Sequence, residues 1–141
     1  MHAKGNSGFT LIELMIVIEI IAIVAAMAIP ALLRQRITTN EAAAVNNLRT
    51  VCTAQISFNT VNLRYGSFED LTAGSGIGAG AFLDGVWTDG GIRSEYVFAM
   101  TDLTDQTFEV TAEPESVGRG GLRSFSVDES GVIQVLERDG G

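Results

Sequence analysis

Hydrophobic side chains along this chain follow three patterns, and each pattern predicts a different element. The first is an almost continuous apolar run from Phe9 to Leu33. At about 1.5 Å per residue, these 25 residues make a helix of about 37 Å, which is long enough to cross a hydrocarbon layer of about 30 Å. We therefore expect a membrane-spanning helix over 9–33.

The second pattern, in 34–63, has the period of an amphipathic helix. Apolar residues recur on one stripe at about 100° per residue, while polar residues gather on the opposite side. Glu41 and Gln55 interrupt the stripe. The pattern predicts that the helix continues from 9 to 63 as a rod of about 80 Å, with its second half beneath a globular head. The stripe consists of Ile37, Ala44, Leu48, Val51, Cys52 and Phe58.

The third pattern consists of short segments rich in aromatic and β-branched residues, which is typical of strands. Turn residues separate these segments, and the link from Asp128 to Gly131 is a good hairpin turn because glycine accepts a positive φ. We expect a small antiparallel sheet over 94–136, covered on one face by the amphipathic helix. Its strands are predicted at 96–100, 107–111, 123–127 and 132–136.

The stretch 64–91 lies between the predicted helix and the predicted sheet and is rich in glycine. We expect a loop region with room for a short turn of helix. Three aromatic residues, Phe68, Phe82 and Trp87, are expected to pin this loop onto the head. Together the three patterns predict an α+β protein with a long N-terminal helix and a C-terminal head over 64–141.

Charge is distributed unevenly between the two parts. Residues 1–64 hold five basic and three acidic residues, a net charge of +2, while residues 65–141 hold four arginines and fourteen acids, a net charge of −10. Binding to nucleic acid phosphates requires clustered Lys and Arg. We therefore expect no nucleic acid partner for the head.

The residues that enzymes use for catalysis are scarce in this chain. His2 is the only histidine and lies before the apolar run, and Cys52 is the only cysteine, expected to be a small buried hydrophobe. The acids Asp102, Asp105, Asp128 and Glu129 have a spacing that fits no calcium loop. We expect no enzymatic activity, no cofactor and no metal site.

Two carboxylates, Glu13 and Glu19, lie inside the apolar run. An acid in a spanning helix costs about 2.5–3.5 kcal/mol on insertion scales, so it is usually paired, protonated or functional. Glu13 lies close to one membrane face, and Glu19 lies deeper. Six residues at about 100° each place the two carboxylates about 120° apart around the helix, so they are not expected to share one partner.

The N-terminus combines these features in one order: a short polar peptide ending at Gly8, then Phe9-Thr10-Leu11-Ile12-Glu13-Leu14, then an apolar run that contains Pro30. Over 4–36 this arrangement resembles the N-terminus of a bacterial type IV prepilin. In that family, a glycine, an aromatic residue and a carboxylate stand at the same spacing.

The resemblance implies a role for each matching position. Residues 1–8 would be a leader peptide that a membrane peptidase removes after Gly8, and the new N-terminal residue, Phe9, would be N-methylated. Glu13 would pair with the terminal amine of a neighbouring subunit during assembly. Pro30 would produce a kink or a locally unwound stretch. Glu19 departs from the apolar character usual at its position.

The function implied by the resemblance is that of a structural pilus subunit. Such a subunit is held in the inner membrane by a single span and is then built by the pilus assembly machinery into an extracellular helical homopolymer. Two alternatives stay open: a pseudopilin of a type II secretion system, and a minor pilin with a binding role. The missing calcium-loop pattern weakens the first, and the acidic head disfavours DNA as a ligand of the second.

Overall fold

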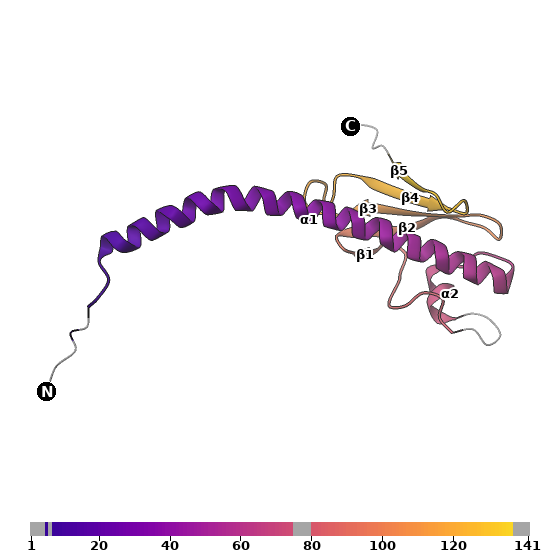
Figure 1. Ribbon diagram of the computed structural model, residues 1–141. Coiled ribbons are helices and arrows are strands. Elements are labelled where there is room, and N and C mark those ends of the chain that lie inside the picture. The colour runs from indigo at the N-terminus through magenta and orange to yellow at the C-terminus, as the bar shows by residue number, and fades with distance from the viewer. Residues whose placement is uncertain (1–4, 6, 75–79, 137–141) are drawn as a thin grey trace. The chain divides into compact units, whose positions relative to one another are not determined.

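The computed structural model describes residue 5, residues 7–74 and residues 80–136. The chain divides into two compact units, Met1–Gln35 and Arg36–Gly141. One long helix, α1 (Leu11–Asn62), begins in the first unit and ends in the second (Figure 1).

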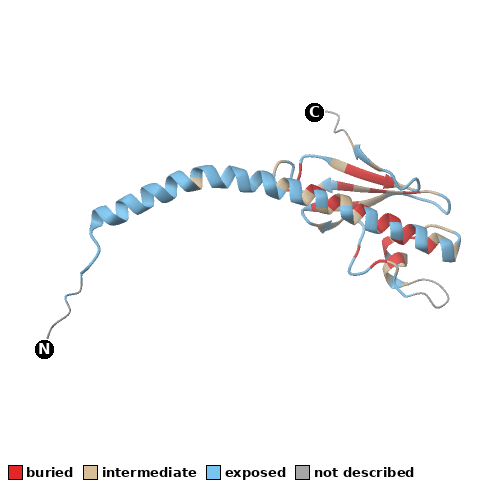
Figure 2. Cartoon of the chain, viewed as in Figure 1, coloured by how far each residue is buried: buried red, intermediate tan, exposed pale blue. Residues whose placement is uncertain are grey.

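In the first unit, α1 presents its apolar side chains to the surroundings. From residue 7 to residue 35 only Ala25 is partly covered, and side chains such as Ile18 and Met27 are 62% and 76% exposed (Figure 2). By length and composition α1 is apolar enough to cross a membrane, and its most apolar window is 0% buried. The exposure of so much apolar surface means that this segment needs a lipid or protein environment.

Pro30 lies inside α1, and the helix is unbroken on both sides of it. A proline in a helix removes one amide donor and crowds the preceding turn. Of the two expected consequences, a locally unwound stretch is not present at Pro30, and a kink stays a prediction.

The second unit contains a five-stranded antiparallel sheet in the order β1-β2-β3-β4-β5. Each strand pairs with the next along the chain, so the sheet is a simple meander. The second half of α1 lies across one face of the sheet (Figure 1). The strands are β1 (Gly91–Arg93), β2 (Tyr96–Leu103), β3 (Phe108–Pro114), β4 (Ser124–Asp128) and β5 (Ile133–Leu136).

The predicted α+β fold and the four predicted strands are confirmed, with boundary shifts of up to three residues. The hairpin turn is also confirmed, because Gly131 has a φ of 74° and donates its amide to the Asp128 carbonyl at 3.0 Å. Strand β1 was not predicted. It is three residues long and contains one apolar side chain, Ile92, so it carries no alternating pattern.

The core of the second unit lies between the helix stripe and one face of the sheet. Leu48, Val51 and Phe58 of α1 are 0% exposed, and Cys52 is buried, as predicted. Alternate residues of the strands meet them, because successive side chains of a strand point to opposite faces. These strand residues are Tyr96, Phe98, Phe108, Val110, Ala112, Phe125 and Val127.

The loop region contains one short helix, α2 (Phe68–Ala73). Its first turn is closed by a capping box, in which Ser67 accepts from the Asp70 amide and the Asp70 carboxylate accepts from the Ser67 amide. Phe68 and Trp87 are buried and stacked with ring centroids 5.8 Å apart, and Phe82 packs edge-on against Phe58. The predicted pinning of the loop by aromatic residues is therefore confirmed.

Candidate functional site

The N-terminal motif lies on an accessible part of the first unit. Gly8 and Phe9 are both exposed, Phe9 to 85%, and a Cβ on Gly8 would meet nothing within 4 Å. The Gly8–Phe9 peptide bond precedes the first residue of α1, Leu11. A processing enzyme could therefore reach this bond without unwinding the helix.

Thr10 and Glu13 form a capping box at the start of α1. The Glu13 carboxylate accepts from the Thr10 amide and from the Thr10 hydroxyl, each at 2.8 Å, and the Glu13 amide donates to that hydroxyl at 3.4 Å. A negative charge in the first turn also complements the helix dipole. The capping box holds the carboxylate at the helix end that carries Phe9.

The sequence predicts that Glu13 lies near one membrane face and that Glu19 lies deeper, and the two carboxylates occupy separate positions on α1. Both side chains are exposed on the helix, six positions from each other. Glu13 bonds to Thr10, whereas Glu19 lies in a stretch of α1 whose neighbours are all apolar. Only Glu13 is therefore positioned next to the predicted new N-terminus.

A second polar cluster, in the second unit, was not predicted as a site. Glu41 of α1 is buried, and its carboxylate accepts from the Leu122 amide at 3.0 Å, the Arg123 amide at 3.3 Å and the Arg123 Nε at 3.0 Å. The Arg123 Nη2 completes an ion pair with the second carboxylate oxygen. Glu41 thus fastens the connection between β3 and β4 to the helix.

The ionisation of this cluster follows from its geometry. Burial alone would raise the pKa of Glu41, but the hydrogen bonds from Arg123 and Leu122 together hold it below its usual value. Burial, followed by the nearby Glu41 charge, raises the pKa of Tyr96 to about 12. Tyr96 therefore stays a hydrogen-bond donor at neutral pH, and its hydroxyl donates to the Arg123 carbonyl at 2.8 Å.

Glycine is required where this connection passes Tyr96. A Cβ on Gly121 would lie 2.6 Å from Tyr96 Cζ, and one on Gly120 would lie 2.8 Å from the Glu95 carbonyl oxygen. Such distances cannot be accommodated without movement, because the neighbouring groups are a buried ring and a backbone atom. The two glycines let the connection approach the sheet closely enough for Arg123 to reach Glu41.

One sequence signal could have identified this cluster. Glu41 interrupts the apolar stripe of α1, and a buried carboxylate requires a cation or several hydrogen-bond donors. Gln55, the other interruption, follows the same logic: its side-chain amide bonds both the Gly66 carbonyl, at 2.6 Å, and the Gly66 amide, at 3.0 Å. The partner of Glu41, 82 positions away in the chain, could not be identified from local sequence.

Comparison with known proteins finds similarity to the N-terminal segment and to one pilin. Residues 3–29 match the model of the prokaryotic N-terminal methylation motif. The chain is 48% identical over 63 residues to the type IV major pilin protein PilA of Myxococcus xanthus strain DK1622. That alignment covers 45% of this chain and 29% of the relative's length.

Proposed function

We propose that this chain is a structural subunit of a type IV pilus. The observation that carries the proposal is the exposed apolar part of α1, most of which lies within the segment that matches the methylation motif. A segment of this kind is stable in lipid, and it is equally stable among identical helices in the centre of a filament.

Processing comes first in the proposed sequence of events. A prepilin peptidase cuts the accessible bond after Gly8, and the new amino group of Phe9 is methylated. The chain is a substrate in both steps and has no catalytic role of its own. Until assembly, the apolar part of α1 keeps the protein in the inner membrane with a single span.

Assembly then uses the carboxylate of Glu13. In an apolar filament centre, an ammonium group and a carboxylate are each costly alone, and breaking such a buried pair costs about 3–5 kcal/mol. The capping box with Thr10 already holds Glu13 at the end of the helix. The Phe9 amine of a neighbouring copy can therefore pair with it, and a copy in the wrong register leaves both charges unpaired.

The proposal is tested by electron microscopy of filaments sheared from cells, with mass spectrometry of their subunit. A pilus subunit gives filaments in which this chain dominates and begins at a methylated Phe9. A chain that is scarce in the sheared fraction indicates a minor pilin, and one confined to the periplasm indicates a pseudopilin. Either result overturns the proposal.

A Glu13→Val variant separates processing from assembly. We expect it to be cut and methylated normally but to give few filaments, because the paired amine loses its carboxylate. A matched Glu129→Gln variant, which also removes one exposed acid but outside the N-terminal segment, controls for the change in net charge. Wild-type filament yield from Glu13→Val would remove the role proposed for Glu13.

A further inference from the structure

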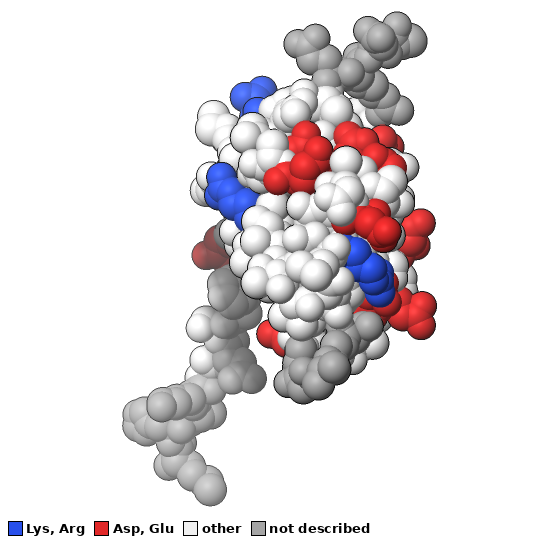
Figure 3. Space-filling view, turned by 90° about the vertical axis from the view of Figure 1, so that its right-hand side faces the viewer, with Lys and Arg blue, Asp and Glu red and all other residues white. Residues whose placement is uncertain are grey.

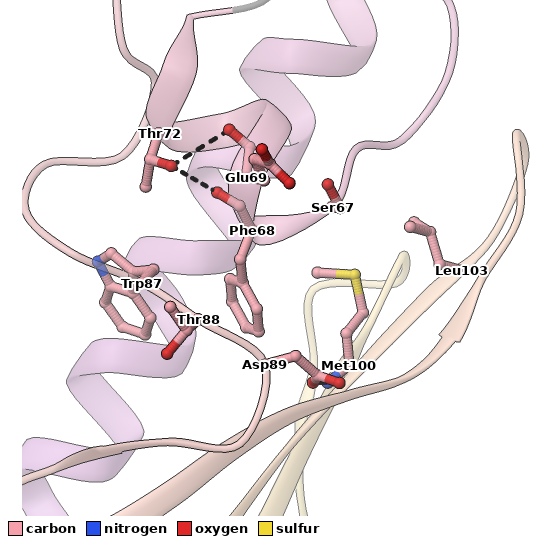
Figure 4. Close-up of a pocket in the computed structure, with 9 residues that line it drawn as sticks. All are labelled: Ser67, Phe68, Glu69, Thr72, Trp87, Thr88, Asp89, Met100 and Leu103. Carbon is pink, nitrogen blue, oxygen red and sulfur yellow. Dashed lines mark hydrogen bonds between the residues drawn. The ribbon is translucent and has the colours of Figure 1, made fainter.

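A cavity in the second unit is not used by the processing or assembly steps described above. It has a volume of about 470 Å³ and lies between α2, the segment around Trp87 and strand β2 (Figure 4). This volume falls within the range of about 300–1,000 Å³ that is usual for ligand pockets. Its size is compatible with a bound ligand or side chain.

One part of the cavity wall is apolar. The Phe68 ring is stacked on Trp87, which also donates its indole N–H to the Asp84 carbonyl at 3.1 Å. Met100 and Leu103 of β2 complete the apolar lining (Figure 4). An occupant therefore needs a hydrocarbon portion that can lie against these side chains.

The charge of the cavity is negative. Its lining includes two acids, Glu69 and Asp89, and no basic residue. Asp89 is held in place because one carboxylate oxygen accepts from the Met100 amide at 2.8 Å. For the Glu69 carboxylate, no hydrogen bond or ion pair occurs within the described part of the chain. An apolar wall beside two carboxylates fits a cation on an apolar stem, as in an arginine side chain.

The arginines near this cavity in the same chain are already engaged. Arg93 lies over the Trp87 ring at 4.2 Å and donates to the Val86 carbonyl at 2.9 Å, and Arg64 pairs with Asp70 at 3.3 Å. Arg123 is bound to Glu41. The chain therefore does not fill the cavity with one of these three cations.

Three other arginines of the second unit are exposed and form no side-chain interaction within its described residues: Arg36, Arg49 and Arg119. Two of them, Arg36 and Arg49, lie on α1, while acids predominate at the end of the unit that carries α2 and the β2–β3 turn (Figure 3). The basic surface of α1 in one copy is therefore complementary in charge to the acidic end of the second unit in another copy.

In a filament of parallel copies, which the proposed function requires, these two surfaces would meet. Suppose that the α1 helices of two parallel copies lie side by side. If the second copy is shifted along the helix axis toward the C-terminal end of the first copy's α1, then an earlier part of the second copy's α1 lies beside that end. A shift of about 20 Å, or 13 residues at about 1.5 Å, aligns Arg49 of the shifted copy with Asn62. The cavity is next to this end, because Gln55 of α1 is bonded to Gly66, which precedes α2.

We infer that the cavity lined by Phe68, Glu69, Trp87 and Asp89 receives an α1 arginine, Arg49 or Arg36, of a neighbouring copy in the filament. The inference rests on the proposed function, since it requires a polymer of parallel copies. The arginine stem lies against the apolar part of the lining, and its guanidinium bonds the carboxylate of Glu69 or of Asp89. This contact joins the heads, whereas Glu13 and Phe9 join the N-terminal ends.

The absence of lysine after position 4 gives a direct test. Arg49→Lys and Arg36→Lys each add one side-chain amine to a mature chain whose only other amine is that of Phe9. A carbodiimide then links an amine to a carboxylate in contact with it. The methylated Phe9 amine is secondary and also reacts, so mass spectrometry of the junction separates its products from those of the new lysine. In sheared filaments we expect a cross-linked dimer whose junction maps to Glu69 or Asp89. Arg119→Lys is the matched control and should not give that junction.

Junctions from both α1 variants that map only to other acids, or no dimer from either variant, would overturn the inference. A second measurement uses charge reversal. Glu69→Arg should lower the filament yield by about fivefold, the factor that corresponds to about 1 kcal/mol for one contact, and Arg49→Glu or Arg36→Glu in the same chain should restore it. No restoration by either also counts against the inference.

These results are separable from the proposed function. If wild-type cells produce no filaments of this chain, then the proposed function fails before any contact is tested. If wild-type filaments form but the junction is absent, then only the arginine contact fails.

Discussion

Glu41 lies buried on the face of α1 that packs against the sheet, and its four hydrogen bonds all come from Leu122 and Arg123. We predict that Glu41→Gln lowers the melting temperature of the head by about 5–10 °C, because a neutral amide leaves Arg123 and a buried amide poorly paired. The measurement is the fluorescence of Trp87, the only tryptophan, in the full chain in detergent micelles. Glu129→Gln, an exposed acid, should change little.

The same carboxylate makes head stability depend on pH. The pKa of Glu41 is lowered in the folded chain, so its stabilisation is complete above its unfolded pKa of about 4.3 and is lost as the pH falls through the folded value. We predict that the melting temperature falls more steeply below about pH 4 in the wild type than in Glu41→Gln. Parallel curves for the two proteins would show that Glu41 does not carry this dependence.

Gly121 lies against a buried ring, which is a steric requirement that no local sequence pattern displays. We predict that Gly121→Ala destabilises the head by about 2 kcal/mol, since the new Cβ would lie 2.6 Å from Tyr96 Cζ and push the connection away from Glu41. Thermal unfolding followed by Trp87 fluorescence measures the loss. Gly80→Ala is the matched control, because a Cβ there meets nothing within 4 Å.

At the scale of elements, the two helices differ in what makes them stable. The second half of α1 is stabilised by packing, but α2 spans only Phe68–Ala73 and depends on its caps. We predict that Ser67→Ala destabilises the head by about 1 kcal/mol, because the Asp70 amide loses its acceptor. Ser57→Ala removes an exposed hydroxyl that bonds only the Thr53 carbonyl, and we expect almost no change in the same melting experiment.

The elements show which parts of the fold could be predicted from the sequence. The long helix and four strands were predicted because their apolar residues recur with a period of 3.6 or 2. Strand β1 was missed because Gly91-Ile92-Arg93 is too short for any period and exists only through pairing with β2. The capping box of α2 is visible as Ser67 followed by Asp70, but 64–91 was interpreted through its glycines.

As with the fold, only part of the candidate functional sites could be predicted from the sequence. Gly8, Phe9 and Glu13 were predicted because their signal is contiguous in the sequence, and their roles stay predictions. The Glu41–Arg123 pair and the cavity beside Trp87 were not, because their members come from segments that only the folded sheet brings together. Local patterns therefore predict a processing segment at the N-terminus, and tertiary contacts are needed to identify the surfaces of the head.

At the scale of the whole molecule, the two units require different surroundings. The first exposes an apolar helix that needs lipid or other helices, while the second buries its own core and carries an excess of acids on its surface. In the proposed function, removal of the peptide before Phe9 controls the passage from one environment to the other, because it creates the amine that Glu13 is proposed to pair with.

Gly8→Ala tests this control. We predict that cutting falls by about tenfold or more, the loss that corresponds to a misfit of about 1.4 kcal/mol in the transition state, and that uncut chain accumulates in the membrane fraction. Immunoblots of membrane and sheared fractions, with mass spectrometry of the N-terminus, measure both. Gly5→Ala is the matched control, because it adds the same methyl group, with nothing within 4 Å, three residues before the cut. Mature chain at wild-type levels from Gly8→Ala would show that the glycine does not determine cleavage, and uncut chain in sheared filaments would show that assembly does not need the free Phe9 amine.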